Sequence, residues 1–167
     1  MSRLLCVLLL PVLLLCLCGA LRAASEPVET DWLALMPKDE VEALTAGTPS
    51  SQAAVDHSMR GSQTGSSRTV AEMDGKAIRI AGYIVPVQTS DDGQLKAFFL
   101  VPYFGACIHV PPPPPNQIIL ARLKTPITMT GIYDAFWVSG TLKVEATDGD
   151  TAATAYTMAV DTVKLYE

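Results

Sequence analysis

Five consecutive prolines at positions 111–115 place a strong restriction on how this chain folds. Proline has no backbone N–H, so the run cannot donate to a sheet ladder and cannot form a central strand. It favours the polyproline II conformation, which rises roughly 3.1 Å per residue, so five residues extend about 15 Å. The sequence therefore predicts a stiff strap that crosses the surface of the fold.

The reactive side chains of the chain lie directly before this run. Cys107 is the one cysteine beyond residue 25, and His109 is one of two histidines. In an extended backbone, residues two apart project to the same side, so these two side chains are expected to share a face. The thiol and the imidazole therefore form the candidate site with the richest chemistry in this sequence.

Residues 1–25 are typical of a cleaved export signal. Arg3 provides the positive charge, a leucine-rich core follows, and small residues come after it. The apolar run is shorter than the about 20 residues that a membrane span needs, and Pro11 interrupts it. Leucine precedes both Cys16 and Cys18, which disfavours lipid attachment. We expect a periplasmic protein with no stable membrane span after cleavage.

Loss of the leader makes the chain more acidic and leaves it with one thiol. The chain has 12 basic and 17 acidic residues, and removal of Arg3 and Arg22 leaves 10 basic residues and a net charge of −7. With Cys107 as the one remaining cysteine, no internal disulfide can form. The acidic balance argues against nucleic acid or anionic lipid as a partner.

The mature chain divides into three parts. Residues 26–45 form an arm in which Trp32 is an apolar anchor and residues 38–44 are expected to form a short helix after Pro37. Residues 46–74 are rich in small and polar residues and are expected to be a flexible linker. Residues 75–167 form the folded body.

The folded body is predicted to be all-β. Strands are expected at residues 76–87, 95–101, 117–123, 127–133, 137–147 and 153–166, with a break at Thr125-Pro126. The long first strand contains Gly82, which suggests a bulge or sharp bend. Such a strand resembles the strongly curved first strand of an OB-fold, which pairs with two neighbours. We therefore expect a small, OB-fold-like barrel of five or six strands.

The proline strap has two interpretations. As a rigid ridge it would be a docking surface, because polyproline II loses little entropy on binding. Alternatively, it only crosses the mouth of the barrel. The predicted docking residues are Tyr103, Phe104, Pro111, Pro112, Pro113, Pro114, Pro115, Asn116 and Gln117.

Three interpretations of Cys107 and His109 remain open. Thiolate and imidazole suit Zn²⁺ or Cu⁺, but two ligands are fewer than zinc requires, so another segment or a partner would complete the site. A Cys/His-dependent enzyme would need hydrogen-bond contact between the pair and an orienting third group. In the third interpretation Cys107 is a buried small apolar residue and His109 pins the start of the strap.

Three segments resemble a bacterial envelope family known as domain of unknown function 3299. They are the stretch from Leu100 through Cys107, His109 and the prolines to Gln117, the stretch from Asp31 to Pro37, and the stretch from Gly75 to Pro86. The resemblance implies no established activity. It does imply an accessory of an ABC-type system for export or for metal uptake, with a permease or another envelope protein as partner.

We therefore expect a secreted, periplasmic binding protein with no enzymatic activity and, if it holds a metal, zinc at Cys107 and His109. A Cys/His-dependent enzyme and a purely structural interaction module are the alternatives.

Overall fold

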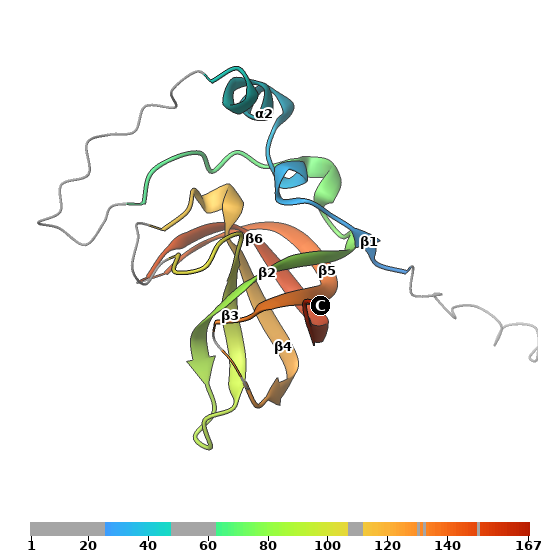
Figure 1. The fold of residues 1–167 in the computed structure, drawn as a ribbon, viewed down its shortest axis with the longest axis vertical. Helices are drawn as coiled ribbons and strands as arrows, with labels where there is room; N and C mark the ends of the chain where they lie inside the picture. The colour runs from blue at the N-terminus through green and yellow to red at the C-terminus, as the bar shows by residue number, and fades with distance from the viewer. Residues whose placement is uncertain (1–25, 48–62, 107–111, 130, 132, 150) are drawn as a thin grey trace, which may run out of the picture.

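The computed structural model describes residues 26–47, 63–106, 112–129, 131, 133–149 and 151–167. Within these residues, six strands form one sheet, with one α-helix and three short 3₁₀ helices outside it (Figure 1). The strands are β1 (Val28–Glu29), β2 (Ala77–Thr89), β3 (Leu95–Val101), β4 (Ile119–Ile127), β5 (Ala135–Asp148) and β6 (Ala153–Leu165). The helices are η2 (Trp32–Leu35), α2 (Lys38–Thr45), η3 (Ala71–Met73) and η4 (Pro115–Gln117).

Strand β2 closes the sheet into a five-stranded barrel. Its first half pairs with β5 as far as Tyr83, and its second half pairs with β3 from Tyr83 onward. The order around the barrel is β2-β3-β4-β6-β5, and β4 and β6 run parallel while the other neighbours run antiparallel. The prediction of a small all-β, OB-fold-like barrel with a strongly curved first strand is confirmed.

Gly82 lies next to the point where β2 changes partners. A Cβ atom added there would lie 2.7 Å from the carbonyl oxygen of Val101 and 3.0 Å from the Leu100 side chain. The register with β5 runs through this glycine without a shift. Glycine is therefore required for close approach of the backbones rather than for a bulge.

The barrel interior is filled by apolar residues of the predicted strands. Phe98, Leu100, Val138 and Tyr156 have no exposed surface. The same core continues beyond the strands, because Leu35 from η2 and Met73 from η3 are also buried in it. The arm and the barrel therefore share one hydrophobic core.

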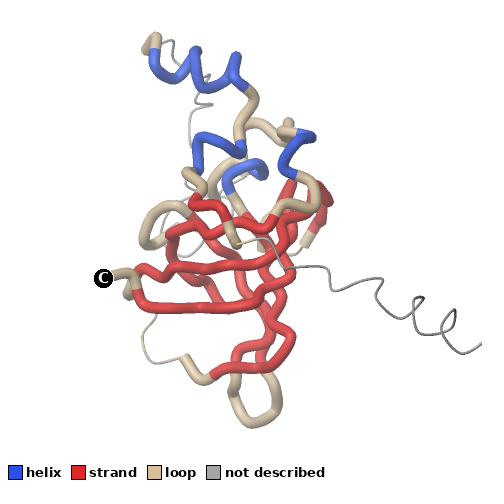
Figure 2. Tube along the Cα trace, turned by 90° about the vertical axis from the view of Figure 1, so that its right-hand side faces the viewer, coloured by secondary structure: helices blue, strands red, loops and turns tan. Residues whose placement is uncertain are grey.

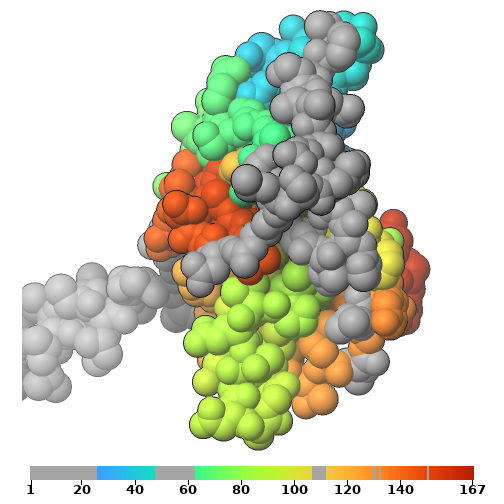
Figure 3. Space-filling model, turned by 90° about the vertical axis from the view of Figure 1, so that its left-hand side faces the viewer, coloured from blue at the N-terminus to red at the C-terminus, as the bar shows by residue number. Residues whose placement is uncertain are grey.

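The helices gather at one end of the barrel and cap it (Figure 2). Trp32 lies partly buried against the core, and its Nε1 donates a 2.7 Å hydrogen bond to the carbonyl oxygen of Ala81. In the space-filling view, residues of the arm in blue to cyan lie with the green segment on top of the strands (Figure 3). The predicted roles of Trp32 as anchor and of Pro37 as the start of a helix are confirmed.

Two local predictions differ from the structure, and one short strand was not predicted. The strand predicted at residues 127–133 is absent: among the described positions of that stretch only Ile127 is in a strand, as the last residue of β4, which continues through Pro126. This is possible because the β4–β6 pairing ends at Leu123 and the β3–β4 register shifts beyond Arg122, so the missing proline N–H interrupts no regular ladder. The short strand β1 is an addition, paired parallel to the start of β2.

The second half of the predicted linker has defined contacts. Gln63 donates to the carbonyl oxygens of Pro113 and Ala153 at 2.8 and 2.9 Å, and its Oε1 accepts from the Ala153 N–H at 2.8 Å. Gln63 therefore fastens this segment to both the strap and the start of β6. The first half, with His57, lies outside the described residues.

Candidate docking groove

The proline strap is shorter than the sequence predicts. Pro114 has φ −50° and ψ 147°, which is close to polyproline II, but Pro115 begins the 3₁₀ helix η4. Proline fits the first turn of a helix because its missing N–H would be unpaired there in any case. Pro113 is buried, while Pro112 and Pro115 are half-buried. The strap therefore packs against the fold instead of standing free above it.

Asn116 connects the end of the strap to the arm. Its side chain has no exposed surface, and its Nδ2 donates to the Glu40 carboxylate at 3.0 Å and to the Arg68 carbonyl oxygen at 3.1 Å. Two acceptors face this nitrogen, which fixes the orientation of the amide group. Among the described residues, Asn116 Oδ1 has no hydrogen-bond partner. Asn116 thus joins residues separated by up to 76 positions in the chain.

Glu40 is the acceptor shared by the strap and the returning segment. Its second carboxylate oxygen accepts a 2.6 Å hydrogen bond from the Ser66 hydroxyl, and Arg68 lies 3.4 Å from the same oxygen. Arg68 also pairs with Asp39 at 2.5 Å, and its hydrogen bond lowers the pKa of that carboxyl group. The charge of Glu40 is therefore compensated while its position on α2 is fixed.

A groove of about 470 Å³ lies between α2 and the strap. Its walls are mainly apolar, and Leu33 and Leu44 are 47% and 50% exposed. The polar residues that line it are Glu40, Ser66, Asn116 and Gln117, and the apolar ones are Leu33, Met36, Ala43, Leu44, Gly65 and Pro114. Such a groove is suited to an apolar segment that brings a few hydrogen-bonding groups.

Gln117 supports the floor of this groove. Its Nε2 donates to the carbonyl oxygen of Trp32 at 3.1 Å, so η4 is held against η2. Three of the residues that the sequence predicts for docking, Pro114, Asn116 and Gln117, therefore meet at one groove.

The predicted aromatic docking residues lie elsewhere on the surface. Phe104 is 49% exposed and packs edge-on against Tyr83, with ring centroids 5.9 Å apart. Its other neighbour is Tyr133, at 5.6 Å, which is 72% exposed. Tyr103 is 45% exposed, and neither Tyr103 nor Phe104 lines the groove. The structure thus separates Tyr103 and Phe104 from the groove that Pro114, Asn116 and Gln117 line.

The predicted metal ligands, Cys107 and His109, lie outside the described residues, as does the predicted docking residue Pro111. In the part of the chain that the structure describes, no three histidine, cysteine or carboxylate side chains form a group that would hold a metal ion.

Sequence reasoning missed the partners of the strap. Glu40 has an ordinary local role as an acidic residue in the first turn of a helix. Ser66 and Arg68 lie in a polar segment without periodicity. The one sequence signal for such a cluster was the pair of amides directly after the prolines.

The comparisons with known proteins agree on the family. The model of the family described as "Protein of unknown function (DUF3299)" matches residues 32–165. The chain belongs to this family. The resemblance that the three sequence segments indicated is therefore confirmed.

A solved structure shows the same fold in another DUF3299 protein. The crystal structure of a DUF3299 family protein from Pseudomonas aeruginosa PAO1 has 35% sequence identity and a TM-score of 0.67. The match covers 86% of the present chain and 98% of that protein. No curated protein matches the chain significantly. Among the described helices of this DUF3299 protein, none is long and apolar enough to cross a membrane.

Proposed function

We propose that this DUF3299 protein is a secreted accessory protein of the bacterial cell envelope that acts by binding a partner protein rather than by catalysis. The observation that carries the proposal is the groove between α2 and the strap, where Leu33 and Leu44 remain about half exposed. The groove has rigid walls, because Asn116, Gln117 and Glu40 hold its sides together by hydrogen bonds. A preformed groove loses little entropy when it is filled.

The occupant that fits the groove best is a segment of a partner protein with apolar side chains next to basic ones. Residues 26–47 contain six acidic residues and one basic residue. Arg68 compensates two of them, Asp39 and Glu40, and the other four leave the segment that forms one wall of the groove with a net negative charge. Charge complementarity therefore favours lysine or arginine beside the apolar anchors of the partner.

The envelope location and the transport role rest on the leader and on the family resemblance. In this proposal the partner is the permease of an ABC-type system or another envelope protein. Zinc or Cu⁺ at Cys107 and His109 is the proposed cargo or cofactor, with further ligands supplied by the partner. Exported protein should begin between residues 21 and 26 and carry no lipid, which intact mass of the periplasmic fraction tests.

Site-specific crosslinking in cells tests the groove. A photo-crosslinking amino acid replaces Leu33 or Leu44 in one experiment and Asp92, at the turn between β2 and β3, in the control. We expect one identified envelope protein to crosslink from positions 33 and 44 but not from 92. The crosslinked segment of that protein should contain apolar residues beside lysine or arginine.

Competition and mass measurements decide between occupants. Leu44→Asp should abolish the crosslink from position 33, whereas Asp92→Asn should leave it unchanged, and both variants should unfold as cooperatively as the parent. A crosslink to a second copy of this chain, with a dimer in sedimentation that Leu44→Asp removes, would overturn the partner proposal. Equal crosslinking from positions 44 and 92 would also overturn it.

A further inference from the structure

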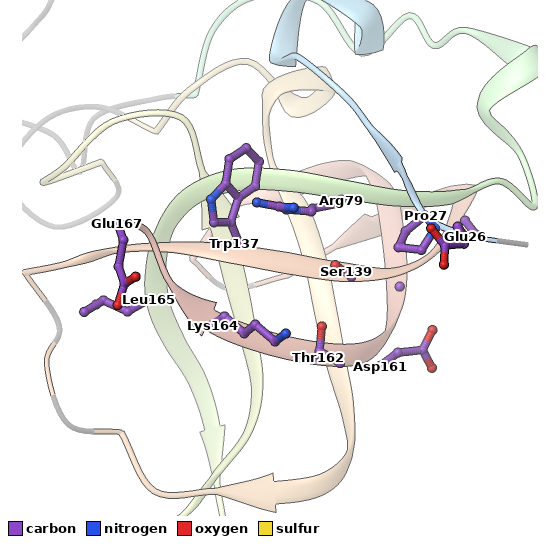
Figure 4. A pocket seen from close by; sticks show the side chains of 12 residues that line it. Glu26, Pro27, Arg79, Trp137, Ser139, Asp161, Thr162, Lys164, Leu165 and Glu167 are labelled. Atoms are coloured by element: carbon purple, nitrogen blue, oxygen red, sulfur yellow. The ribbon is translucent and has the colours of Figure 1, made fainter.

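A second groove, of about 790 Å³, lies on the outer face of β2, β5 and β6, away from the proline strap (Figure 4). Strand register places Arg79 opposite Ser139 on β5, which lies opposite Thr162 on β6. Two residues away from Ser139 along β5, Trp137 lies opposite Lys164 on β6. These positions alternate with buried residues, so their side chains all point outward on one face.

Arg79 is held in place by an aromatic ring. Its guanidinium carbon lies 4.0 Å from the centroid of the Trp137 ring, and Figure 4 shows the two side chains side by side. Trp137 in turn packs against Tyr166, with ring centroids 5.1 Å apart. Stacking occupies the flat face of a guanidinium and leaves the N–H groups along its edge available for a ligand. The arginine is therefore oriented before any ligand arrives.

The N–H groups of this arginine have no acceptor in the described parts of the chain. The ion pairs found there involve Arg68 and Lys124, and no hydrogen bond from the Arg79 side chain occurs. Glu29 is paired in register with Arg79 on the neighbouring strand but does not form an ion pair with it. This is unusual in a chain where acidic residues outnumber basic ones by 17 to 12.

The charges around the groove favour an anion at its centre. Lys164 is exposed and forms no ion pair with any described residue, while Asp161 is already bound by Lys124 at 2.6 Å. Glu26 and Glu167 lie at opposite ends of the groove in Figure 4. Between those ends the face offers two cationic side chains and the hydroxyl groups of Ser139 and Thr162.

We propose that this face is a binding site for a phosphate group. Arg79 would bind two phosphate oxygens through its paired N–H groups, Lys164 would approach another oxygen, and the hydroxyl groups would donate to the remaining ones. Phosphate fits better than carboxylate because it has enough oxygens and charge for all four donors. The overall negative charge of the chain excludes long-range attraction of polyanions but not local recognition of a single group. This site is independent of the docking groove and of the partner proposed there.

The two tryptophans of the chain provide the measurement and its internal control. In an NMR titration with inorganic phosphate, the indole N–H signal of Trp137 should shift to saturation. The signal of Trp32, whose indole N–H is held by the Ala81 carbonyl oxygen of β2 and which does not line this groove, should not move. Sodium chloride at equal ionic strength should not reproduce the shift. A similar shift of the Trp137 signal with chloride would overturn the proposal. So would a Trp137 signal that reaches saturation neither with inorganic phosphate nor with the phosphatidylglycerol vesicles described below.

Variants assign the binding to the named residues. Arg79→Gln should weaken phosphate binding by about tenfold or more, since it removes a charge-assisted, two-point contact. Arg79→Lys should give an intermediate affinity, and Lys124→Gln, which removes a paired cation elsewhere, should leave the affinity unchanged. An unshifted Trp32 signal in each variant shows that the fold is intact. Unchanged affinity in a folded Arg79→Gln protein would refute the site.

Vesicles separate the two sources of the phosphate group. Saturation with inorganic phosphate but not with phosphatidylglycerol vesicles identifies a soluble phosphate-bearing ligand. An Arg79-dependent shift with phosphatidylglycerol vesicles and none with phosphatidylcholine identifies a lipid headgroup. Both results support the phosphate site.

Discussion

The hydroxyl group of Tyr156 donates a 2.9 Å hydrogen bond to the carbonyl oxygen of Leu35, a residue 121 positions earlier in the chain. The hydroxyl oxygen of Tyr156 also accepts a 2.8 Å hydrogen bond from the backbone N–H of Val70. Tyr156 and Leu35 both have no exposed surface. One side chain of β6 therefore joins the arm, the returning segment and the barrel at the capped end.

We predict that Tyr156→Phe lowers the free energy of unfolding by about 1–3 kcal/mol, because it leaves the Val70 N–H and the Leu35 carbonyl without this partner in a buried place. Urea unfolding followed by circular dichroism measures the change. Tyr133→Phe is the matched control, since Tyr133 is 72% exposed, and it should change stability by less than about 0.5 kcal/mol. Equal effects of the two substitutions would contradict the bridging role of Tyr156.

The same tyrosine predicts a loss of stability in alkali. Burial raises the pKa of the Tyr156 phenol above its usual value of 10.0, with a smaller rise from the charge of Glu40, against the hydrogen bond from Val70 that lowers it. The unfolded chain therefore releases this proton at lower pH than the folded chain does. The stabilising contribution is complete below the unfolded pKa and is lost as the pH rises through the folded pKa. Unfolding titrations from about pH 8 to about pH 11 should show this loss in the parent and a shallower loss in Tyr156→Phe.

We predict that Gly82→Ala destabilises the barrel by about 1–3 kcal/mol or more through overpacking. The added methyl group would lie 2.7 Å from a backbone oxygen of Val101, which cannot move without shifting β3. Thr125→Ala, at an exposed position on β4, is the control. Its free energy of unfolding should lie within about 0.5 kcal/mol of that of the parent. Thermal and urea unfolding of the two variants provide the comparison. A Gly82→Ala protein as stable as the parent would show that β2 and β3 can separate without cost.

We predict that Asn116→Asp destabilises the cap by about 3 kcal/mol near neutral pH, because a buried carboxylate would face the Glu40 carboxylate and the Arg68 carbonyl oxygen. The deficit should shrink as the pH falls and the new acid is protonated, since the neutral acid can donate a hydrogen bond. Gln88→Glu makes the same amide-to-acid change at an exposed position and should have little effect. Parallel unfolding curves at about pH 7 and about pH 4 test this, and a deficit independent of pH would contradict it.

The metal proposal predicts that Cys107→Ala and His109→Ala both weaken binding of Zn²⁺ or Cu⁺ in equilibrium competition against a chelator. Two protein ligands give modest affinity, so the competition should include the mature chain with and without its crosslinked partner. If the two residues are structural, both substitutions should instead lower stability by about 1–3 kcal/mol and leave metal affinity unchanged. That second pattern would end the metal proposal.

Local pattern was sufficient for most of the barrel. Alternation of apolar residues predicted the long strands at both ends of the folded body. Gly82 indicated a special position in the first of them, but the predicted bulge is a close approach of two backbones. Pro37 and the acidic residues after it marked the start of α2. These features depend on residues that are neighbours in the chain, because strand period, helix capping and backbone restriction all act over a few positions.

Pairing partners were decided by the tertiary structure. The sequence predicts that Pro126 ends a strand, but β4 continues through it, because β6 no longer pairs with β4 at that point. The sequence placed Ser66 and Arg68 in a predicted flexible linker, yet both contact Glu40 beside the strap. The proline run itself indicated a strap but did not indicate that its last residue would begin a helix.

The amino-acid sequence was sufficient to indicate the family, the strand pattern and the amides that end the strap. Only closure of the barrel determined what those amides contact, because Asn116, Glu40 and Arg68 come from three segments that have no local relation to one another. The same closure brought Arg79 to Trp137 and left its N–H groups without an acceptor in the described chain. Short-range preferences select the elements of a fold, whereas a binding surface depends on which distant side chains are packed together when the core is buried.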